Sequence, residues 1–176
     1  MKRFGVRRMT IEDVARSAGV TRPTVYAYFK DKQSLIDAAH LWNAHLVRVE
    51  LEARFASAGS FADKVAIAVR YGLTQSDPLE FGLLDPEGLA LMLTTESESW
   101  LERSTNFWLP HVLEAQQAGE IRSELDATET ARWIGSSVFA LSIMAPADST
   151  KRQIERAEHA ARTFLAGGLG YSPTLP

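Results

Sequence analysis

The stretch over residues 9–32 constrains the fold of this 176-residue chain most, because it carries start and stop signals for two short helices. Thr10 is a good N-cap and Asp13 can complete a capping box, which predicts a helix beginning at Ile11. Gly19 suits the left-handed residue that ends such a helix, since it has no side chain to clash. These signals place the end of the first helix and a tight turn at the glycine.

A second helix is expected over residues 22–29, because Thr21 is a second N-cap and proline is tolerated in a first helical turn. Two short helices around such a turn describe a helix-turn-helix, whose second helix enters the DNA major groove. Val25 and Phe29 are spaced to face inward. The outward face then carries side chain types that can reach bases and phosphates: Arg22, Thr24, Tyr26, Ala27 and Tyr28. By spacing alone, a helical hairpin unrelated to DNA is the alternative.

The charge distribution favours DNA. Residues 1–32, here called the head, hold eight Lys or Arg against three acids, a net charge of +5. The remainder of the chain, the body, holds eleven basic residues against nineteen acids, a net charge of −8. Phosphate affinity depends on the field at the contact surface, so the overall net charge of −3 is no argument against DNA binding.

The same residues resemble the DNA-binding domain of TetR-family transcriptional regulators over roughly residues 4–40. The similarity lies in the runs 10–15, 18–21 and 24–35, and a weaker motif, Ala-Gly-Glu-Ile-Arg, follows at 118–122. The resemblance implies that Thr10 caps the first helix of the motif and touches a phosphate, and that Lys32 contacts another phosphate. It also implies a recognition surface formed by Arg22, Pro23, Thr24, Tyr26, Ala27 and Tyr28.

The chain departs from the family pattern at its start. The family places a full helix before the motif, and residues 1–6 supply only its tail. Two short helices bury too little apolar surface to be stable alone. We therefore expect upstream residues to be missing from the sequence given, so that the first helix of the DNA-binding domain is largely absent.

The rest of the chain predicts an all-α protein, because no segment shows convincing alternation with period two. We expect a helix-turn-helix DNA-binding domain over residues 1–45 and a helical ligand-binding and dimerisation domain over residues 46–176. Caps and helix-breaking residues predict helices over 31–58, 60–76, 97–118, 126–145 and 150–166, with a further helix starting near 85. The 31–58 helix carries apolar residues at helical intervals: Leu35, Ile36, Ala39, Trp42, Leu46, Val49 and Phe55.

The middle of the chain is unusually rich in aromatic residues, which favours a small-molecule pocket. Trp100, Phe107 and His111 share one face of a predicted helix, and Pro110 is expected to kink it beside them. An apolar pocket with one imidazole suits a mostly apolar effector. The expected pocket residues are Tyr71, Phe81, Met92, Trp100, Phe107 and His111. The alternative is that these aromatics form ordinary core.

The last two predicted helices carry small and apolar residues along one side, which favours pairing with a second copy of the chain. The expected interface residues are Ile134, Val138, Leu141, Ala157, Ala161 and Phe164. The TetR resemblance also implies a homodimer, whose recognition helices would be about 34–36 Å apart and match a palindromic site. The alternative is that both stripes pack onto their own subunit.

Enzymatic readings find little support. His111 and Glu114 could begin a helical carboxylate metal site, but the chain has no second His-x-x-Glu pair. With no cysteine, no phosphate-binding Gly-rich loop and no triad order, we expect no catalytic residues, no metal and no cofactor. No long apolar segment or signal peptide is present in the sequence, so no membrane contact and a cytoplasmic location are expected.

Together these patterns predict a ligand-responsive transcriptional regulator, in the form of a homodimeric repressor that a small, mostly apolar effector releases from a palindromic DNA operator. The competing hypothesis is an all-α small-molecule-binding or enzymatic module with an incidental helical hairpin.

Overall fold

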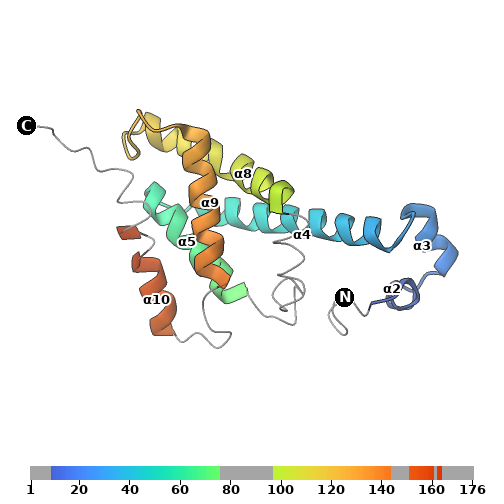
Figure 1. Cartoon of the computed structure of the whole chain (residues 1–176). Helices are drawn as coiled ribbons and strands as arrows, with labels where there is room; N and C mark the ends of the chain where they lie inside the picture. Colours follow the sequence, from blue (N-terminus) through green and yellow to red (C-terminus); the bar gives the residue numbers. More distant parts are fainter. Residues whose placement is uncertain (1–8, 76–96, 144–150, 161, 164–176) are drawn as a thin grey trace, which may run out of the picture.

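The computed structural model describes residues 9–75, 97–143, 151–160 and 162–163, and the regular elements in these ranges are all helices (Figure 1). This confirms the all-α prediction, although the helix expected near residue 85 lies outside the described residues. In chain order the helices are α2 (Ile11–Ala18), α3 (Arg22–Tyr28), α4 (Lys32–Phe55), α5 (Phe61–Gln75), α8 (Ser97–Gln117), α9 (Ala127–Ile143) and α10 (Lys151–Ala160).

The two helices of the head begin and end where the local signals predict. The Thr10 hydroxyl accepts a hydrogen bond from Asp13 N (3.2 Å), and Asp13 Oδ2 accepts one from Thr10 N (3.0 Å), so the capping box is complete. Gly19 has φ 67°, the left-handed conformation that ends α2. Thr21 caps α3 by accepting a hydrogen bond from Thr24 N (3.3 Å). Each of these contacts is local, which is why the sequence was sufficient to predict them.

The core of the head is small. Ile11, Ala15 and Val25 are its fully buried members, with Phe29 and Leu35 packed partly against them. Val25 and Phe29 thus face inward as predicted, although α3 ends at Tyr28 and Phe29 is its C-cap. Leu35 belongs to α4, so the first turn of α4 completes the packing of the helix-turn-helix.

The long helix α4 connects the head to the body (Figure 1). Asp31 caps it by accepting a hydrogen bond from Ser34 N (2.8 Å), and this bond holds the pKa of Asp31 below its ordinary value. The helix runs for 24 residues without glycine or proline and ends at Phe55, slightly earlier than expected. The predicted domain boundary at residue 45 falls inside this continuous helix.

The apolar stripe of α4 is buried only at its ends. Ile36 in the first turns of α4 is buried, and Leu51 and Phe55 near its other end enter the body core. In the middle, Trp42 and Val49 are 64% and 53% exposed. Helical spacing shows which residues share a face, but burial depends on a packing partner, and the described helix that packs most on α4 is α5.

The body core lies where α9 packs between α8 and α5 (Figure 1). Its fully buried side chains come from all three helices and the turn between α8 and α9: Val65, Val69, Val112, Ile121 and Ile134. Pro110 lies within α8 without ending it. On its other side α5 contacts α10, so α5 is the central helix of the described body.

The motif at 118–122 forms the turn between α8 and α9. Gly119 has φ 75°, a conformation that favours glycine, and Glu120 N then donates to Ala115 O (2.8 Å). Ile121 is anchored in the core, and Glu120 Oε2 accepts a hydrogen bond from Phe61 N at the start of α5 (2.7 Å). The motif therefore ties α8, α9 and α5 together at one end of the body.

Among the residues that the structure describes, no helix combines the length and the apolar character that crossing a membrane requires.

Candidate DNA-binding surface and effector region

The outer face of α3 is open to solvent at the end of the molecule far from α5, α9 and α10 (Figure 1). Tyr28 is 80% exposed and Tyr26 42%. The other predicted recognition residues, Arg22, Pro23, Thr24 and Ala27, are exposed as well. A short exposed helix with aromatic, hydroxyl and guanidinium groups can insert into a groove and donate to base edges or phosphates.

Thr10 and Lys32 flank this helix. The Thr10 hydroxyl both caps α2 and donates to Asp13 Oδ2 (2.7 Å), and the hydrogen bonds from its side chain and backbone hold the pKa of Asp13 below its ordinary value. Lys32 is the first residue of α4 and is half-buried. Both therefore lie at helix N-termini, which favour phosphate contacts.

Arg22 is held by two neighbours on the surface of the head. Its guanidinium forms an ion pair with Glu12 of α2, and its Nη2 donates to the Tyr26 hydroxyl (3.4 Å). The guanidinium also lies over the Tyr26 ring, 5.4 Å from the centroid. Glu12 is the residue here that sequence reasoning missed, because its partner lies on the next helix and no local spacing signals the contact.

The predicted effector residues do not form one cluster in the described part of the chain. Phe107 and His111 come together in the core, with ring centroids 5.4 Å apart. Trp100 instead packs on Phe139 of α9, at 4.6 Å. Phe81 and Met92 lie outside the described residues.

His111 sits in an aromatic cluster between α4 and α8. Its ring is 5.1 Å from Phe55, edge to face, and Trp108 and Phe107 pack on the same residues. Its Nε2 is buried, has no hydrogen-bond partner and lies 3.5 Å from Glu52 Oε1. Burial lowers the pKa of His111, and the nearby carboxylates of Glu52 and Glu114 offset this only in part.

Tyr71 lines a separate hollow of about 310 Å³ with Leu46, Val49 and Glu50. Its ring packs under Arg54, 5.4 Å from the centroid, and burial raises the pKa of its hydroxyl. The hollow joins the exposed middle of α4 to α5. It is an open surface hollow whose lining mixes apolar and polar side chains.

One predicted interface residue is placed elsewhere than expected. Ile134 is fully buried in the core of its own subunit, so it cannot contact a second copy. The reason is that α9 packs tightly between α8 and α5. Val138 and Leu141 pack partly against the same core, the side chain of Ala157 is not described, and Ala161 and Phe164 lie outside the described residues. Trp133, next to Ile134, is 45% exposed.

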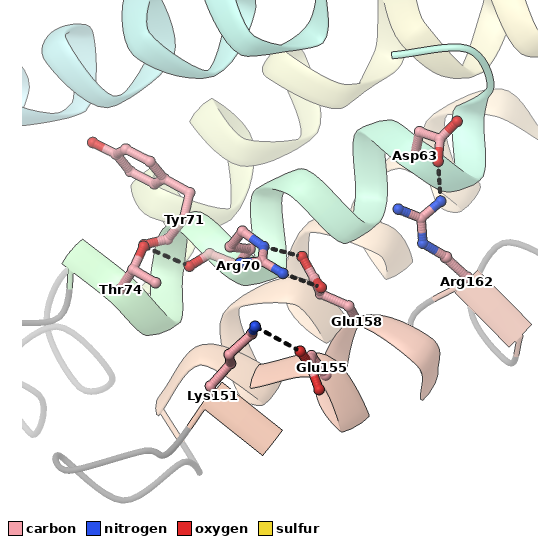
Figure 2. A network of polar contacts seen from close by, with 8 residues as sticks. All are labelled: Asp63, Arg70, Tyr71, Thr74, Lys151, Glu155, Glu158 and Arg162. Atoms are coloured by element: carbon pink, nitrogen blue, oxygen red, sulfur yellow. Dashed lines mark hydrogen bonds and ion pairs between the residues drawn. The ribbon is translucent and has the colours of Figure 1, made fainter. Parts of the chain in front are cut away.

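α10 contacts α5 through charged groups (Figure 2). Arg70 of α5 forms a two-pronged ion pair with Glu158 of α10, and Arg162 pairs with Asp63 at the start of α5. Glu158 is largely buried by this packing, with 15% of its side chain exposed. This face of α10 is thus occupied within its own subunit.

The described residues contain no group of three or more His, Asp or Glu that could hold a metal ion. Of the His111 and Glu114 pair weighed above, Glu114 forms an ion pair with Lys64 of α5, with Nζ and Oε2 2.5 Å apart. The geometry defines a protein with an exposed helix-turn-helix at the end of a long helix and a helical body.

Comparisons with known proteins agree with this class. Residues 1–39 match the family model described as bacterial regulatory proteins, tetR family. A search of the curated proteins finds no match. The fold is shared with the transcriptional regulator FadR from Bacillus subtilis in complex with stearoyl-CoA, at TM-score 0.67 and 17% identity over 96% of this chain and 92% of that one.

Two further solved structures support the same fold. The TetR-family regulator CifR, in complex with a 26-base-pair operator DNA, has TM-score 0.58 and 22% identity over 92% of this chain and 88% of that one. The TetR-family repressor AlkX from a Dietzia strain has TM-score 0.59 and 24% identity over 95% and 89%. The resemblance seen in the sequence is confirmed: the chain has the TetR-family regulator fold with a tetR-type N-terminal domain.

Proposed function

We propose that this protein is a ligand-responsive, DNA-binding transcriptional regulator that acts in the cytoplasm as a homodimeric repressor. The observation that carries the proposal is the capped helix-turn-helix, whose exposed face ends in Arg22, Tyr26 and Tyr28 and whose third partner is the continuous helix α4. The net charge of +5 over the head supplies the field that phosphates require. The proposed contacts are Thr10, Arg22, Pro23, Thr24, Tyr26, Ala27, Tyr28 and Lys32.

The effector is proposed to be small and mostly apolar and to enter among α4, α5 and α8. The hollow beside Tyr71 and the cluster around His111 both include residues of α4. The proposed effector contacts also include the other expected residues, Phe81, Met92, Trp100 and Phe107. Since α4 also supplies Leu35 to the core of the head, a displacement at its far end can move the recognition helix. A ligand shifts the equilibrium between two positions of α4 and its recognition helix only if it binds these two conformations with different affinity.

Two recognition helices in a dimer would read successive major grooves of a palindrome when they are about 34–36 Å apart. We propose that the exposed face of α9, with Trp133 at its centre, contributes to the dimer interface together with Val138, Leu141 and the C-terminal residues Ala157, Ala161 and Phe164. Aromatic residues are typical anchors of such interfaces.

DNA binding is tested by selecting duplexes from a random library with the full chain and measuring Kd against salt concentration. We expect a steep loss of affinity with salt, and a slope that falls by about one in Lys32→Ala, because one phosphate contact is removed. Lys151→Ala, a change at an exposed lysine of α10, is the control and should leave the slope unchanged. No retention of any duplex at low salt would refute DNA binding and favour the binding-module or enzyme hypothesis.

The proposed displacement of α4 by an effector is tested separately with two probes that carry a long acyl chain. Stearoyl-CoA, the ligand of the Bacillus subtilis neighbour, and a free long-chain fatty acid are titrated by calorimetry and then added to the DNA complex. A probe that binds should weaken DNA affinity. If a bound, saturating probe leaves DNA affinity unchanged, the proposed displacement of α4 is wrong for that probe.

A further inference from the structure

The ion pair between Glu12 and Arg22 places a carboxylate on the proposed DNA-binding surface. Glu12 lies in the first turn of α2 and Arg22 is the first residue of α3, so the contact joins the two helices of the motif. About half of each side chain is exposed, 47% for Glu12 and 56% for Arg22. Ion pairs with this exposure add little to stability, which points to a role other than folding.

The contacts of Arg22 fix the direction of a side chain that is otherwise mobile. A free arginine side chain samples many rotamers and loses that freedom on binding. Here the guanidinium is held by the Glu12 carboxylate on one side and by the hydroxyl and ring of Tyr26 on the other. The N-terminal residues of a recognition helix lead into the groove, so Arg22 is presented where base edges are read.

A neighbouring carboxylate discriminates between the two kinds of acceptor that DNA offers. The O6 and N7 acceptors of guanine carry no net charge, so an arginine can donate to them while it keeps a carboxylate partner. A phosphate competes for the same guanidinium and is repelled by the carboxylate. The arrangement thus favours base readout by Arg22 and penalises its use for phosphate binding.

We propose that Glu12 is a specificity-determining residue: it holds Arg22 on the recognition helix for base readout and withholds it from the phosphates of unrelated DNA. The proposal rests on the DNA-binding function proposed above. Glu12 acts through Arg22 and is therefore a positioning residue, which contacts no base in this scheme.

The test uses the full chain, the duplex that the wild type selects from a random library, and a shuffled duplex of the same composition. In Glu12→Gln we expect tighter binding to the shuffled duplex and a fall of about tenfold in the ratio of the two affinities, since one well-oriented base contact is worth that much. Thermal unfolding should change little, because both side chains are exposed.

Asp37→Asn is the matched control, since it removes the same charge from an exposed carboxylate of α4 that accepts a hydrogen bond from Gln33. It should raise both affinities by a similar factor and leave their ratio unchanged. In an Arg22→Lys background, which keeps the charge but lacks the planar fork, Glu12→Gln should change the ratio by less than about twofold.

Three results would overturn the proposal. Glu12→Gln could behave like Asp37→Asn, which would make its effect general electrostatics. Its effect could persist in the Arg22→Lys background, which would show that Glu12 does not act through Arg22. If the wild type selects no sequence at all, sequence-specific DNA binding fails first and the specificity role fails with it.

Discussion

At the scale of single residues, His111 is the buried titratable group at the contact between α4 and α8. It faces Glu52 from α4, Lys64 from α5 and Glu114 from its own helix, and burial is the main cause of its lowered pKa. Its unfolded pKa is close to the ordinary value of 6.5. The folded state therefore favours the neutral imidazole at the point where α4 meets the rest of the body.

This arrangement predicts that stability falls on acidification. Between the lowered pKa of folded His111 and 6.5, the unfolded chain binds more protons than the folded chain, so the free energy of unfolding rises with pH. The contribution of neutral His111 to stability is therefore lost as pH falls through 6.5. Urea unfolding at pH 5.5 and 7.5 should show a smaller pH dependence in His111→Gln than in the wild type. An equal pH dependence in both proteins would contradict this prediction.

At the scale of helices, the packing of α9 on α8 depends on a glycine. A Cβ on Gly135 would collide with the Ser104 hydroxyl and come within 3.2 Å of the Trp108 ring. Gly135 thus permits a close helix approach, and this approach explains why Ile134 beside it is fully buried.

We expect Gly135→Ala to destabilise the protein by about 1–3 kcal/mol, the usual cost of overpacking a core. Denaturant unfolding measures this change. Ser104→Ala in the same protein should restore part of the loss, because it removes the colliding hydroxyl. Gly59→Ala is the control, since its added Cβ meets only Asp63 Oδ2 at 3.5 Å; equal losses at both glycines would contradict the packing argument.

The contact between α10 and α5 depends on a paired charge (Figure 2). Arg70→Met would leave the largely buried Glu158 carboxylate without its guanidinium, and such a group is costly to keep in place. We expect faster amide hydrogen exchange in α10. Lys151→Met, which breaks the exposed pair with Glu155 on α10 alone, should have little effect. Unchanged exchange in Arg70→Met would show that α10 is held by other contacts.

At the scale of the whole molecule, the head and the body are joined by one continuous helix, and the proposed function needs two copies of this unit. The surfaces of α9 and α10 differ in how much side chain they leave free to contact a second copy of the chain. Glu158 of α10 and Arg162, which follows this helix, already form ion pairs within their own subunit, whereas Trp133 of α9 remains half-exposed. The exposed part of α9 is therefore the better candidate for contact with a second copy.

Trp133→Glu should weaken dimerisation by at least tenfold, because it places a charge in an apolar interface and removes an aromatic anchor. Sedimentation at several protein concentrations measures the effect. Tyr28→Glu, at an exposed aromatic of the head, is the control and should leave the oligomeric state unchanged. A Trp133→Glu protein that dimerises like the wild type would place the interface elsewhere.

The helices of the head and most helix boundaries follow from the sequence alone. Caps such as Thr10 with Asp13, Thr21 and Asp31 act within three or four residues, as does the left-handed Gly19, so local spacing is enough to place them. The charge contrast between head and body is likewise a property of the sequence alone.

Which apolar faces are covered and which distant side chains meet depends instead on how the helices pack in three dimensions. Trp42 and Ile134 both belong to helical stripes, yet one is exposed and the other is fully buried, because burial depends on a partner helix. The pairs Glu12 with Arg22 and Arg70 with Glu158 join separate helices. Such contacts follow from the angle and register at which helices pack, which local periodicity does not specify.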